Sequence, residues 1–356
     1  MKKLDEIDQN FKIETNLNKT DIKFYSILNA PCKFYGLIYE NNKFRRMPEK
    51  IAEGVSEGVK YLHTNTAGGR VRFKTDSSYI AISAKMSNIG KMEHFALTGS
   101  CGFDMYIKIN GTEKFVTTFR PPFDITDSYE SVFNFNTNEM REITINFPLY
   151  SDVNMLYIGI EQNAKILEPS NYAYEKPIVY YGSSITQGGC ASRPGNAYTS
   201  MLARKFNMDH INLGFSGNAR GEQEIADYIA SLDMEIFVYD YDHNAPTVEH
   251  LQSTHEKMLN TIRKANPTLP IILMTSVSMD HIHDNRPKRR DIIYQTYQNA
   301  KNNGDNNIYF WDGTKEFAPY EDYGTVEGCH PNDCGFYGMA TTLEPIVKYI
   351  LTNKGA

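Results

Sequence analysis

The amino-acid sequence predicts two domains, a β-sandwich of jelly-roll type followed by an α/β domain with a parallel sheet. Apolar residues recur with a period of two over residues 59–162, which is typical of half-buried strands. Beyond that stretch, short apolar strands alternate with amphipathic helices, which indicates a parallel sheet covered on both faces. The polar, proline-containing segment Glu168–Pro177 separates the two patterns. We therefore expect a sandwich domain over residues 1–170 and an α/β domain over residues 177–356.

Composition limits the classes of partner. The 356 residues include 37 Lys and Arg against 43 Asp and Glu, a net charge of -6, so neither nucleic acid nor an anionic membrane surface is the expected partner. The 5 scattered cysteines do not form a disulfide pattern and suggest free thiols in a reducing compartment. The first ten residues, MKKLDEIDQN, contain no apolar signal region, and the chain has no apolar run long enough to span a membrane. We expect a cytoplasmic protein, or a secreted one if a leader has been removed, and the oligomeric state stays open.

The first domain is predicted from alternation and turn residues. Residues 1 to about 50 are polar, with prolines that break long elements, and are expected to be irregular. The run 103–109 alternates apolar and polar side chains, and Asn110-Gly111 after it favours a tight hairpin turn. No helix is expected within 59–162. The same alternation marks further strands through Ile80, Ile82, Ile143, Ile145, Leu156, Ile158 and Ile160.

The second domain is predicted from short apolar runs and from helical apolar stripes. The predicted strands are Ile178–Tyr181, Ile211–Leu213, Ile236–Asp240, Ile271–Thr275 and Ile308–Trp311. Between and after them, apolar residues recur at helical spacing. They form three stripes: Ile225, Tyr228, Ile229 and Leu232; Val248, Leu251, Met258, Leu259 and Ile262; and Phe336, Ala340, Leu343, Val347 and Ile350.

Residues suited to acyl transfer follow the strands of this second domain. Ser184 follows the first strand, in the run IVYYGSSIT, and is the predicted nucleophile. A serine hydroxyl needs a base within hydrogen-bond reach, and an attacked carbonyl needs donors for its developing charge. The loops 212–218 and 240–246 follow the next two strands, and EGCHP, residues 327–331, precedes the last helix. Because ligands bind at the carboxyl edge of such sheets, we expect these loops to meet there.

Each of these residues also has a purely structural interpretation. A glycine-flanked serine after a strand is often a helix N-cap, and His330 before a proline is compatible with an ordinary turn. Asn244 fits an Asx turn, and Gly217 fits a backbone conformation that needs glycine. The occurrence of all the loops in one order favours the catalytic interpretation over the structural one.

The segment GSSIT resembles the GDSIT block of the SGNH (GDSL-like) hydrolases, and the later loops resemble that family's remaining blocks in order. The resemblance covers residue 177 to about residue 351, and it implies a flavodoxin-like five-stranded domain. In the first domain, GFDMY at 102–106 resembles the GxDLY signature of the sandwich domain that precedes some of these hydrolases, and two-domain carbohydrate esterases share this layout. The resemblance implies Ser184 as nucleophile and His330 as general base. It implies an oxyanion hole formed by the Ser184 N–H, the Gly217 N–H and the Asn244 side chain, and it implies no cofactor and no metal.

The sequence departs from this family at two positions. Ser183 stands where the family has aspartate, which predicts a local rearrangement and no loss of activity. Glu327 stands where the family has the aspartate of DxxH, so either a Ser-His-Glu triad or a Ser-His dyad is expected. The GxSxG esterases are not a template, because Thr186 replaces their second glycine.

Other polar groups are given no catalytic role. Asp280, His281, His283 and Asp284 form a weak metal motif, expected to be a solvated loop or a loop over the cleft. Cys329 and Cys334 flank His330 without a second pair of thiols, which is weak evidence for zinc. The run Lys288–Arg290 is expected to be a solvated helix face, and Asp104 a solvated strand residue.

The sequence therefore predicts a serine esterase that acts on short acyl esters, with acetyl esters of carbohydrates as the favoured substrate. The expected partner is a small-molecule or oligosaccharide ester. Two alternatives stay open: a lipid or thioester acyl hydrolase that uses the same residues, and a glycan-binding protein with a silent hydrolase domain.

Overall fold

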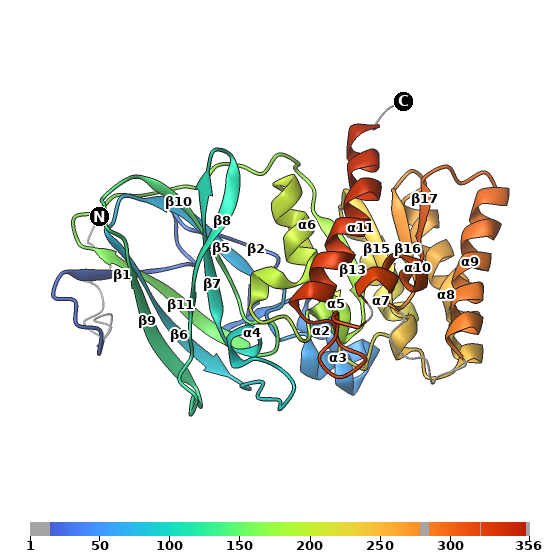
Figure 1. Ribbon diagram of the computed structural model, residues 1–356, viewed down its shortest axis with the longest axis horizontal. Coiled ribbons are helices and arrows are strands. Elements are labelled where there is room, and N and C mark those ends of the chain that lie inside the picture. The colour runs from blue at the N-terminus through green and yellow to red at the C-terminus, as the bar shows by residue number, and fades with distance from the viewer. Residues whose placement is uncertain (1–14, 278–284, 321, 354–356) are drawn as a thin grey trace.

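The computed structural model describes residues 15–277, 285–320 and 322–353. Two lobes lie side by side, with the antiparallel sandwich in one and the parallel sheet with its helices in the other (Figure 1). This agrees with the predicted fold class of a β-sandwich followed by an α/β domain. None of the described helices is long and apolar enough to cross a bilayer.

The sandwich consists of two antiparallel sheets with one apolar core between them. One sheet has the strand order β1-β11-β6-β9, and the other has the order β12-β5-β10-β7-β8 with β2 paired to β5. The strands are β1 (Ile22–Ser26), β2 (Lys33–Tyr35), β5 (Arg70–Thr75), β6 (Tyr79–Ser87), β7 (Phe103–Ile109), β8 (Thr112–Phe119), β9 (Ser128–Asn134), β10 (Arg141–Asn146), β11 (Asp152–Glu161) and β12 (Ile166–Leu167). The hairpin predicted at Asn110-Gly111 joins β7 to β8, and both residues have positive φ.

The expectation of an irregular first 50 residues is wrong for the described part of that segment. It contains β1, β2 and a separate hairpin of β3 (Ile38–Glu40) and β4 (Lys43–Arg45). Most of these strands are only three residues long. Alternation cannot be detected over so few residues, because a period of two needs about four or more positions to show itself.

Helices also occur where none was expected. The helices α2 (Glu49–Val55) and α3 (Glu57–Leu62) precede the sandwich core, and α4 (Leu97–Ser100) interrupts it. Ala52, Val59 and Leu62 pack into an apolar cluster of the second lobe. The first segment of the chain therefore covers part of the α/β lobe, as Figure 1 shows for α2 and α3.

The second lobe contains a five-stranded parallel sheet with the order β14-β13-β15-β16-β17. In chain order this is 2-1-3-4-5, the flavodoxin-like arrangement with a switch point beside its first strand. The strands are β13 (Ile178–Gly182), β14 (His210–Gly214), β15 (Ile236–Asp240), β16 (Ile271–Met274) and β17 (Ile308–Trp311). The helices are α5 (Ser184–Gln187), α6 (Tyr198–Phe206), α7 (Gln223–Ala230), α8 (Val248–Ala265), α9 (Arg286–Asn302), α10 (Gly313–Glu316) and α11 (Asp333–Thr352).

Both faces of this sheet are buried. Along β13, Ile178 and Tyr180 share an apolar cluster with side chains of α6 and α11. Val179 and Tyr181 point the other way, into a cluster with side chains of α7, α8 and α9. Because every side chain of a central parallel strand is covered, such strands appear in the sequence as continuous apolar runs.

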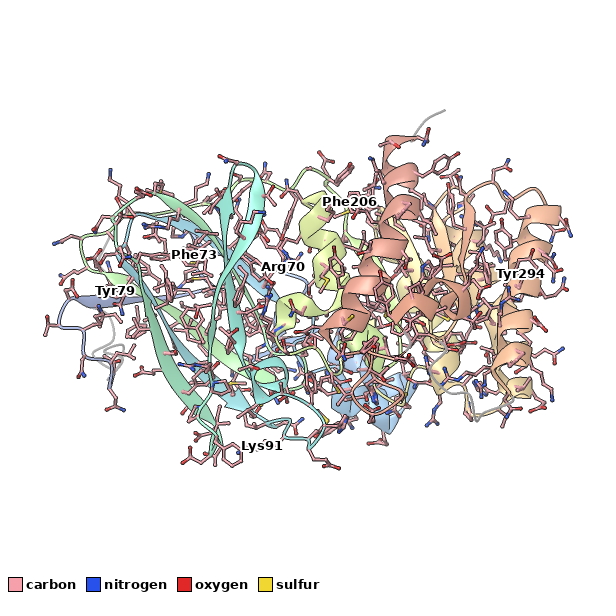
Figure 2. The ribbon with its side chains drawn as sticks, in the orientation of Figure 1. Arg70, Phe73, Tyr79, Lys91, Phe206 and Tyr294 are labelled. Carbon is pink, nitrogen blue, oxygen red and sulfur yellow. The ribbon has the colours of Figure 1, made fainter. Side chains whose placement is uncertain are left out.

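The lobes are joined by buried charged groups. Arg70, on β5, lies between the sandwich and α6 (Figure 2), where its guanidinium donates to the Tyr172 hydroxyl at 2.7 Å and pairs with Asp209. The expectation of a solvated Asp104 is wrong, because its side chain is 0% exposed. Its carboxylate accepts hydrogen bonds from the Gly195 N–H at 2.9 Å and from Arg193 at 3.2 Å, both in the second lobe. Burial raises the pKa of this carboxyl above its usual value.

Replacing Asp104 by asparagine should destabilise the protein by about 2 kcal/mol, because an amide offers one acceptor oxygen and no charge to the three donors Asn146, Gly195 and Arg193. The measurement is the urea midpoint of unfolding. Asp124→Asn, at an exposed position of the same lobe, is the matched control and should change stability by less than about 0.5 kcal/mol. Equal midpoints for the two variants would contradict a joining role for Asp104.

Candidate active site

Ser184 is the first residue of α5 and lies two positions after Gly182, the last residue of β13. Ser184 is nearly buried, with 8% of its surface exposed to solvent. The helix cap is the neighbouring Ser183, whose hydroxyl accepts from the Ile185 N–H at 3.2 Å. The capping role considered for Ser184 thus belongs to Ser183, and the Ser184 hydroxyl is left to other contacts.

His330 reaches Ser184 from the loop before α11. The distance from His330 Nε2 to Ser184 Oγ is 2.9 Å, although the two residues are 146 positions apart in the chain. Asn332 holds the end of this loop, because its side chain accepts from the Cys334 and Gly335 N–H groups at the start of α11. An imidazole nitrogen at this distance is within reach of the hydroxyl proton.

Glu327 contacts the other ring nitrogen of the same imidazole. Its Oε1 lies 2.6 Å from His330 Nδ1 and also accepts from the His330 backbone N–H at 3.0 Å. Gly328 has φ +89°, a left-handed conformation that glycine adopts readily and that turns the loop back between the two residues. The extra methylene of glutamate relative to aspartate is accommodated in this way. The carboxylate stays 38% exposed, so water has access to it.

The two other predicted oxyanion groups lie on neighbouring loops. Gly217 has φ +69°, and a Cβ there would meet no atom within 4 Å, so the backbone conformation itself explains the glycine. Asn244 ends a 3-10 turn after β15, and its Oδ1 accepts from the Ala219 N–H at 3.3 Å. Because the amide oxygen accepts from Ala219, the NH2 group of Asn244 points away from Ala219 and can donate to another acceptor.

Two charged side chains, Arg289 and Asp242, fix the loop that carries Asn244. Arg289, on α9, donates to the Asp242 carbonyl at 2.6 Å and to the Ala245 carbonyl at 2.9 Å, on either side of Asn244. The Asp242 carboxylate accepts from the Ser276 N–H at 2.9 Å, after β16. The expectation of a solvated face at Lys288–Arg290 holds for the exposed Lys288, whereas Arg289 and Arg290 are half-buried and paired, Arg290 with Asp312 at 2.6 Å.

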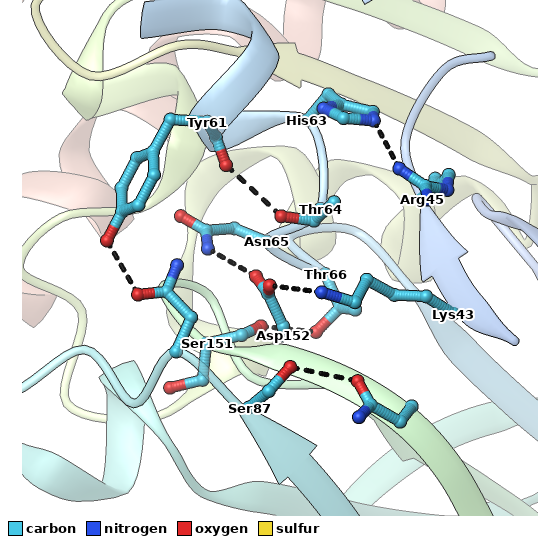
Figure 3. A network of polar contacts seen from close by, with 12 residues as sticks. Lys43, Arg45, Tyr61, His63, Thr64, Asn65, Thr66, Ser87, Ser151 and Asp152 are labelled. Carbon is cyan, nitrogen blue, oxygen red and sulfur yellow. Dashed lines mark hydrogen bonds and ion pairs between the residues drawn. The ribbon is translucent and has the colours of Figure 1, made fainter. Parts of the chain in front are cut away.

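A polar network from the sandwich supports the loop that carries Gly217. In Figure 3 the Asp152 carboxylate accepts from Asn65 at 2.9 Å and from Lys43 at 3.1 Å. The Asn65 side-chain oxygen in turn accepts from Gln187 Nε2 at 3.2 Å, and Gln187 Oε1 accepts from the Ser216 N–H at 3.1 Å. Gln187 follows GSSIT directly, and this adjacency is the signal that could have identified it.

Two further side chains of the first 170 residues touch the site. The buried Arg46 guanidinium donates to the Asn212 carbonyl at 3.2 Å and to the Gly214 carbonyl, and it stacks 4.7 Å from the Phe215 ring. The Tyr150 hydroxyl donates to the Ser184 carbonyl at 3.2 Å. Sequence reasoning missed both residues, because they lie far from any motif.

Two other groups near the site have strongly shifted pKa values. Burial, with the neighbouring Asp242, raises the pKa of Asp240 to about 7, and this carboxyl accepts from the Thr186 hydroxyl at 2.9 Å. Burial lowers the pKa of His243 to about 4, so its imidazole is neutral at physiological pH. Asp240 is buried at the end of β15, and His243 is half-buried in the turn that follows.

Two sets of three side chains near His330 have ligand atoms within 4.8 Å of one another: His94, Cys190 and His330, and Glu327, Cys329 and His330. Cys329 is thus part of such a set, whereas Cys334 lies at an exposed position outside both of them. The motif formed by Asp280, His281, His283 and Asp284 lies outside the described residues.

Both halves of the chain match known family models. Residues 175–348 match the GDSL-like lipase/acylhydrolase family. Residues 22–166 match the GxDLY family, which is the N-terminal domain of SGNH-hydrolase-type esterases. No curated protein sequence matches the chain.

Solved structures share the whole two-domain layout. A protein from Bacteroides ovatus assigned to the GDSL-like lipases is 29% identical, with a TM-score of 0.85 over 93% of this chain and 98% of that chain. A salicylyl-acyltransferase of a tetracycline biosynthetic pathway is 17% identical, with a TM-score of 0.74 over 94% of this chain and 99% of that chain. A family two carbohydrate esterase from Cellvibrio japonicus is 12% identical, with a TM-score of 0.61 over 93% of this chain and 98% of that chain.

Proposed function

We propose that this chain removes acetyl groups from carbohydrates through an acyl-enzyme on Ser184. The premise is that residues 175–348 belong to the GDSL-like lipase/acylhydrolase family and that the chain is a two-domain esterase. The observation that carries this proposal is the hydrogen-bonded series from Glu327 through His330 to Ser184, with distances of 2.6 and 2.9 Å. This series supplies both an activated nucleophile and a group that orients its base.

In the first half of the reaction, His330 Nε2 takes the hydroxyl proton as Ser184 Oγ attacks the ester carbonyl carbon. The negative charge that develops on the carbonyl oxygen is stabilised by the N–H groups of Ser184 and Gly217 and by the Asn244 NH2. The tetrahedral intermediate collapses, His330 gives its proton to the departing sugar hydroxyl, and acetyl-Ser184 remains.

In the second half, His330 takes a proton from water, which attacks the acetyl-serine carbonyl. Collapse of this intermediate releases acetate and returns the proton to Ser184. Glu327 accepts the Nδ1–H throughout, which stabilises the imidazolium formed in each half. No cofactor enters these steps.

The carbohydrate substrate is inferred from the layout of the chain. Neighbours with the same two lobes are named as family two carbohydrate esterases and as an acetyl xylan esterase from Butyrivibrio proteoclasticus, at identities of 12 to 13%, which is a likeness of fold alone. The salicylyl-acyltransferase among the neighbours raises a second candidate, in which an alcohol other than water takes the acyl group from Ser184. Hydrolysis and transfer share the acyl-enzyme and differ only in its acceptor.

Acetate release from a panel of acetylated oligosaccharides should be measurable for the wild type and should fall at least about 10³-fold in Ser184→Ala, because the nucleophile is removed. Ser231→Ala, an exposed serine after α7, is the matched control and should keep full activity. Nitrophenyl esters of increasing chain length separate the acyl classes, because an acetyl esterase loses kcat/KM beyond short chains.

Equal rates on long-chain esters would favour the lipid or thioester alternative. Acyl transfer to an added alcohol at the expense of acetate would favour the acyltransferase. Equal inactivity of the wild type and Ser184→Ala, together with sugar binding, would contradict the esterase proposal and favour a silent domain that binds glycan.

Activity measured between about pH 5 and about pH 8 should be lower at the acidic end, because a protonated imidazole cannot accept the Ser184 proton. The measurement is kcat/KM for a nitrophenyl acetate over this range, with the spontaneous hydrolysis subtracted. A profile that stays flat across the range would argue against His330 as the base.

Glu327→Gln tests the triad against the dyad. We expect kcat to fall about 10²-fold, because the amide lacks the charge that stabilises the His330 imidazolium. Glu224→Gln, an exposed glutamate on α7, is the control and should be unaffected. A loss near that of His330→Ala supports the triad, whereas a loss below about fivefold supports a dyad.

A further inference from the structure

His94 and Cys190 lie beside the imidazole of His330, and each comes from a different part of the chain. His94 belongs to the segment between β6 and α4 of the sandwich, and Cys190 follows α5. One ligand atom from each of these two residues and one from His330 lie within 4.8 Å of one another. The rings of His94 and His330 are 5.4 Å apart between centroids, with an interplanar angle of 41°.

We propose that His94, Cys190 and His330 bind a thiophilic divalent cation such as Zn²⁺, and that the bound ion inhibits the esterase. Two imidazoles and one thiolate are ligands that zinc prefers, and three protein ligands leave a fourth tetrahedral position for water. In such a site neighbouring ligand atoms are separated by about 3.4–3.8 Å, as follows from zinc–nitrogen and zinc–sulfur bonds of about 2.0–2.3 Å. The side chains therefore need to approach one another by only about 1 Å.

The backbone keeps the three ligands together. The Cys190 N–H donates to the carbonyl of Pro331 at 3.0 Å, next to His330 in the chain. The Thr98 hydroxyl donates to the Ser192 carbonyl at 2.6 Å, which joins the end of the His94 segment to the Cys190 loop. Since these bonds do not involve the ligand atoms, they remain when the side chains close on an ion.

An ion can reach this site from solvent on the side of the two histidines. The His330 side chain is 24% exposed and His94 is partly exposed, whereas the Cys190 thiol is 5% exposed and lies at the inner end. The Glu327 carboxylate, 2.6 Å from His330 Nδ1, adds a nearby negative charge that favours a cation.

Cys190 releases its thiol proton to solvent when it coordinates the ion, because zinc binds the thiolate.

The ion inhibits because His330 cannot serve two partners. If the ion occupies Nε2, Ser184 loses the acceptor of its proton, and if it occupies Nδ1, Glu327 loses the N–H that it orients. Either coordination leaves the Ser184 hydroxyl without an active base. Inhibition, though not binding, rests on the catalytic role proposed for His330.

The experiment uses the full chain after treatment with EDTA and its removal. Zinc chloride is titrated against a chromophoric zinc indicator to measure binding, and hydrolysis of nitrophenyl acetate is followed in parallel. We expect one equivalent of zinc to bind to the wild type and to abolish its activity over the same concentration range. His94→Gln and Cys190→Ser should each weaken binding and inhibition by at least about tenfold.

Three further variants serve as controls. Cys334→Ser removes an exposed thiol outside the site, and Cys329→Ser tests the neighbouring set that also contains His330. The double variant His281→Gln and His283→Gln removes the histidine pair of the sequence motif. All of them should bind zinc and be inhibited as the wild type is, and each variant is compared with itself in EDTA, so differences in basal activity cancel.

The proposal is wrong if the wild type binds no zinc, or if His94→Gln and Cys190→Ser bind it unchanged. It is equally wrong if only Cys329→Ser, or only the His281 and His283 double variant, loses the ion. Zinc binding that depends on His94 and Cys190 in a protein inactive on every ester would leave this site standing and contradict the proposed function. Esterase activity in a protein that binds no zinc would support the proposed function and contradict this zinc site.

Discussion

The structure depends on a polar connection from the sandwich to the loop after β14. Gln187, at the end of α5, bonds to Asn65 with its amide nitrogen and to the Ser216 N–H with its amide oxygen. Asn65 is held in turn by Asp152, so the loop that carries Gly217 is fixed from outside its own domain. Because a buried amide is stable only when its groups are paired, the two lobes must dock in one way for this series to be complete.

Arg46 strengthens the same connection. Its side chain is 2% exposed and lies against the Phe215 ring, and its guanidinium bonds to the carbonyls of Asn212 and Gly214. Burial lowers the pKa of this guanidinium to about 9. A charge in such a place is tolerated because backbone carbonyls surround it. The first lobe therefore fixes the end of β14, next to the loop that carries Gly217.

The proposed base and the carboxylate beside it are more exposed than Arg46. Ser184 is almost closed off, whereas His330 and Glu327 are partly exposed on a loop that turns at Gly328. The imidazole must be free to exchange protons with substrate and water, so it cannot be packed as Arg46 is. One ligand atom of His330 also lies within 4.8 Å of one from His94 and one from Cys190.

Much of the fold and of the candidate site was predictable from the sequence, because both depend on local patterns. Continuous apolar runs predicted the strands of the parallel sheet, and the position of GSSIT and EGCHP after strands and before a helix predicted that Ser184 and His330 would meet. The pairing of Glu327 with His330 was left open, because the φ of Gly328 decides it and a glycine permits several values. Asp104 and Arg46 were predicted wrongly or missed, because a charged side chain is buried only when a distant segment supplies its partners. Those partners are brought together by the docking of the two lobes, which the tertiary structure alone decides.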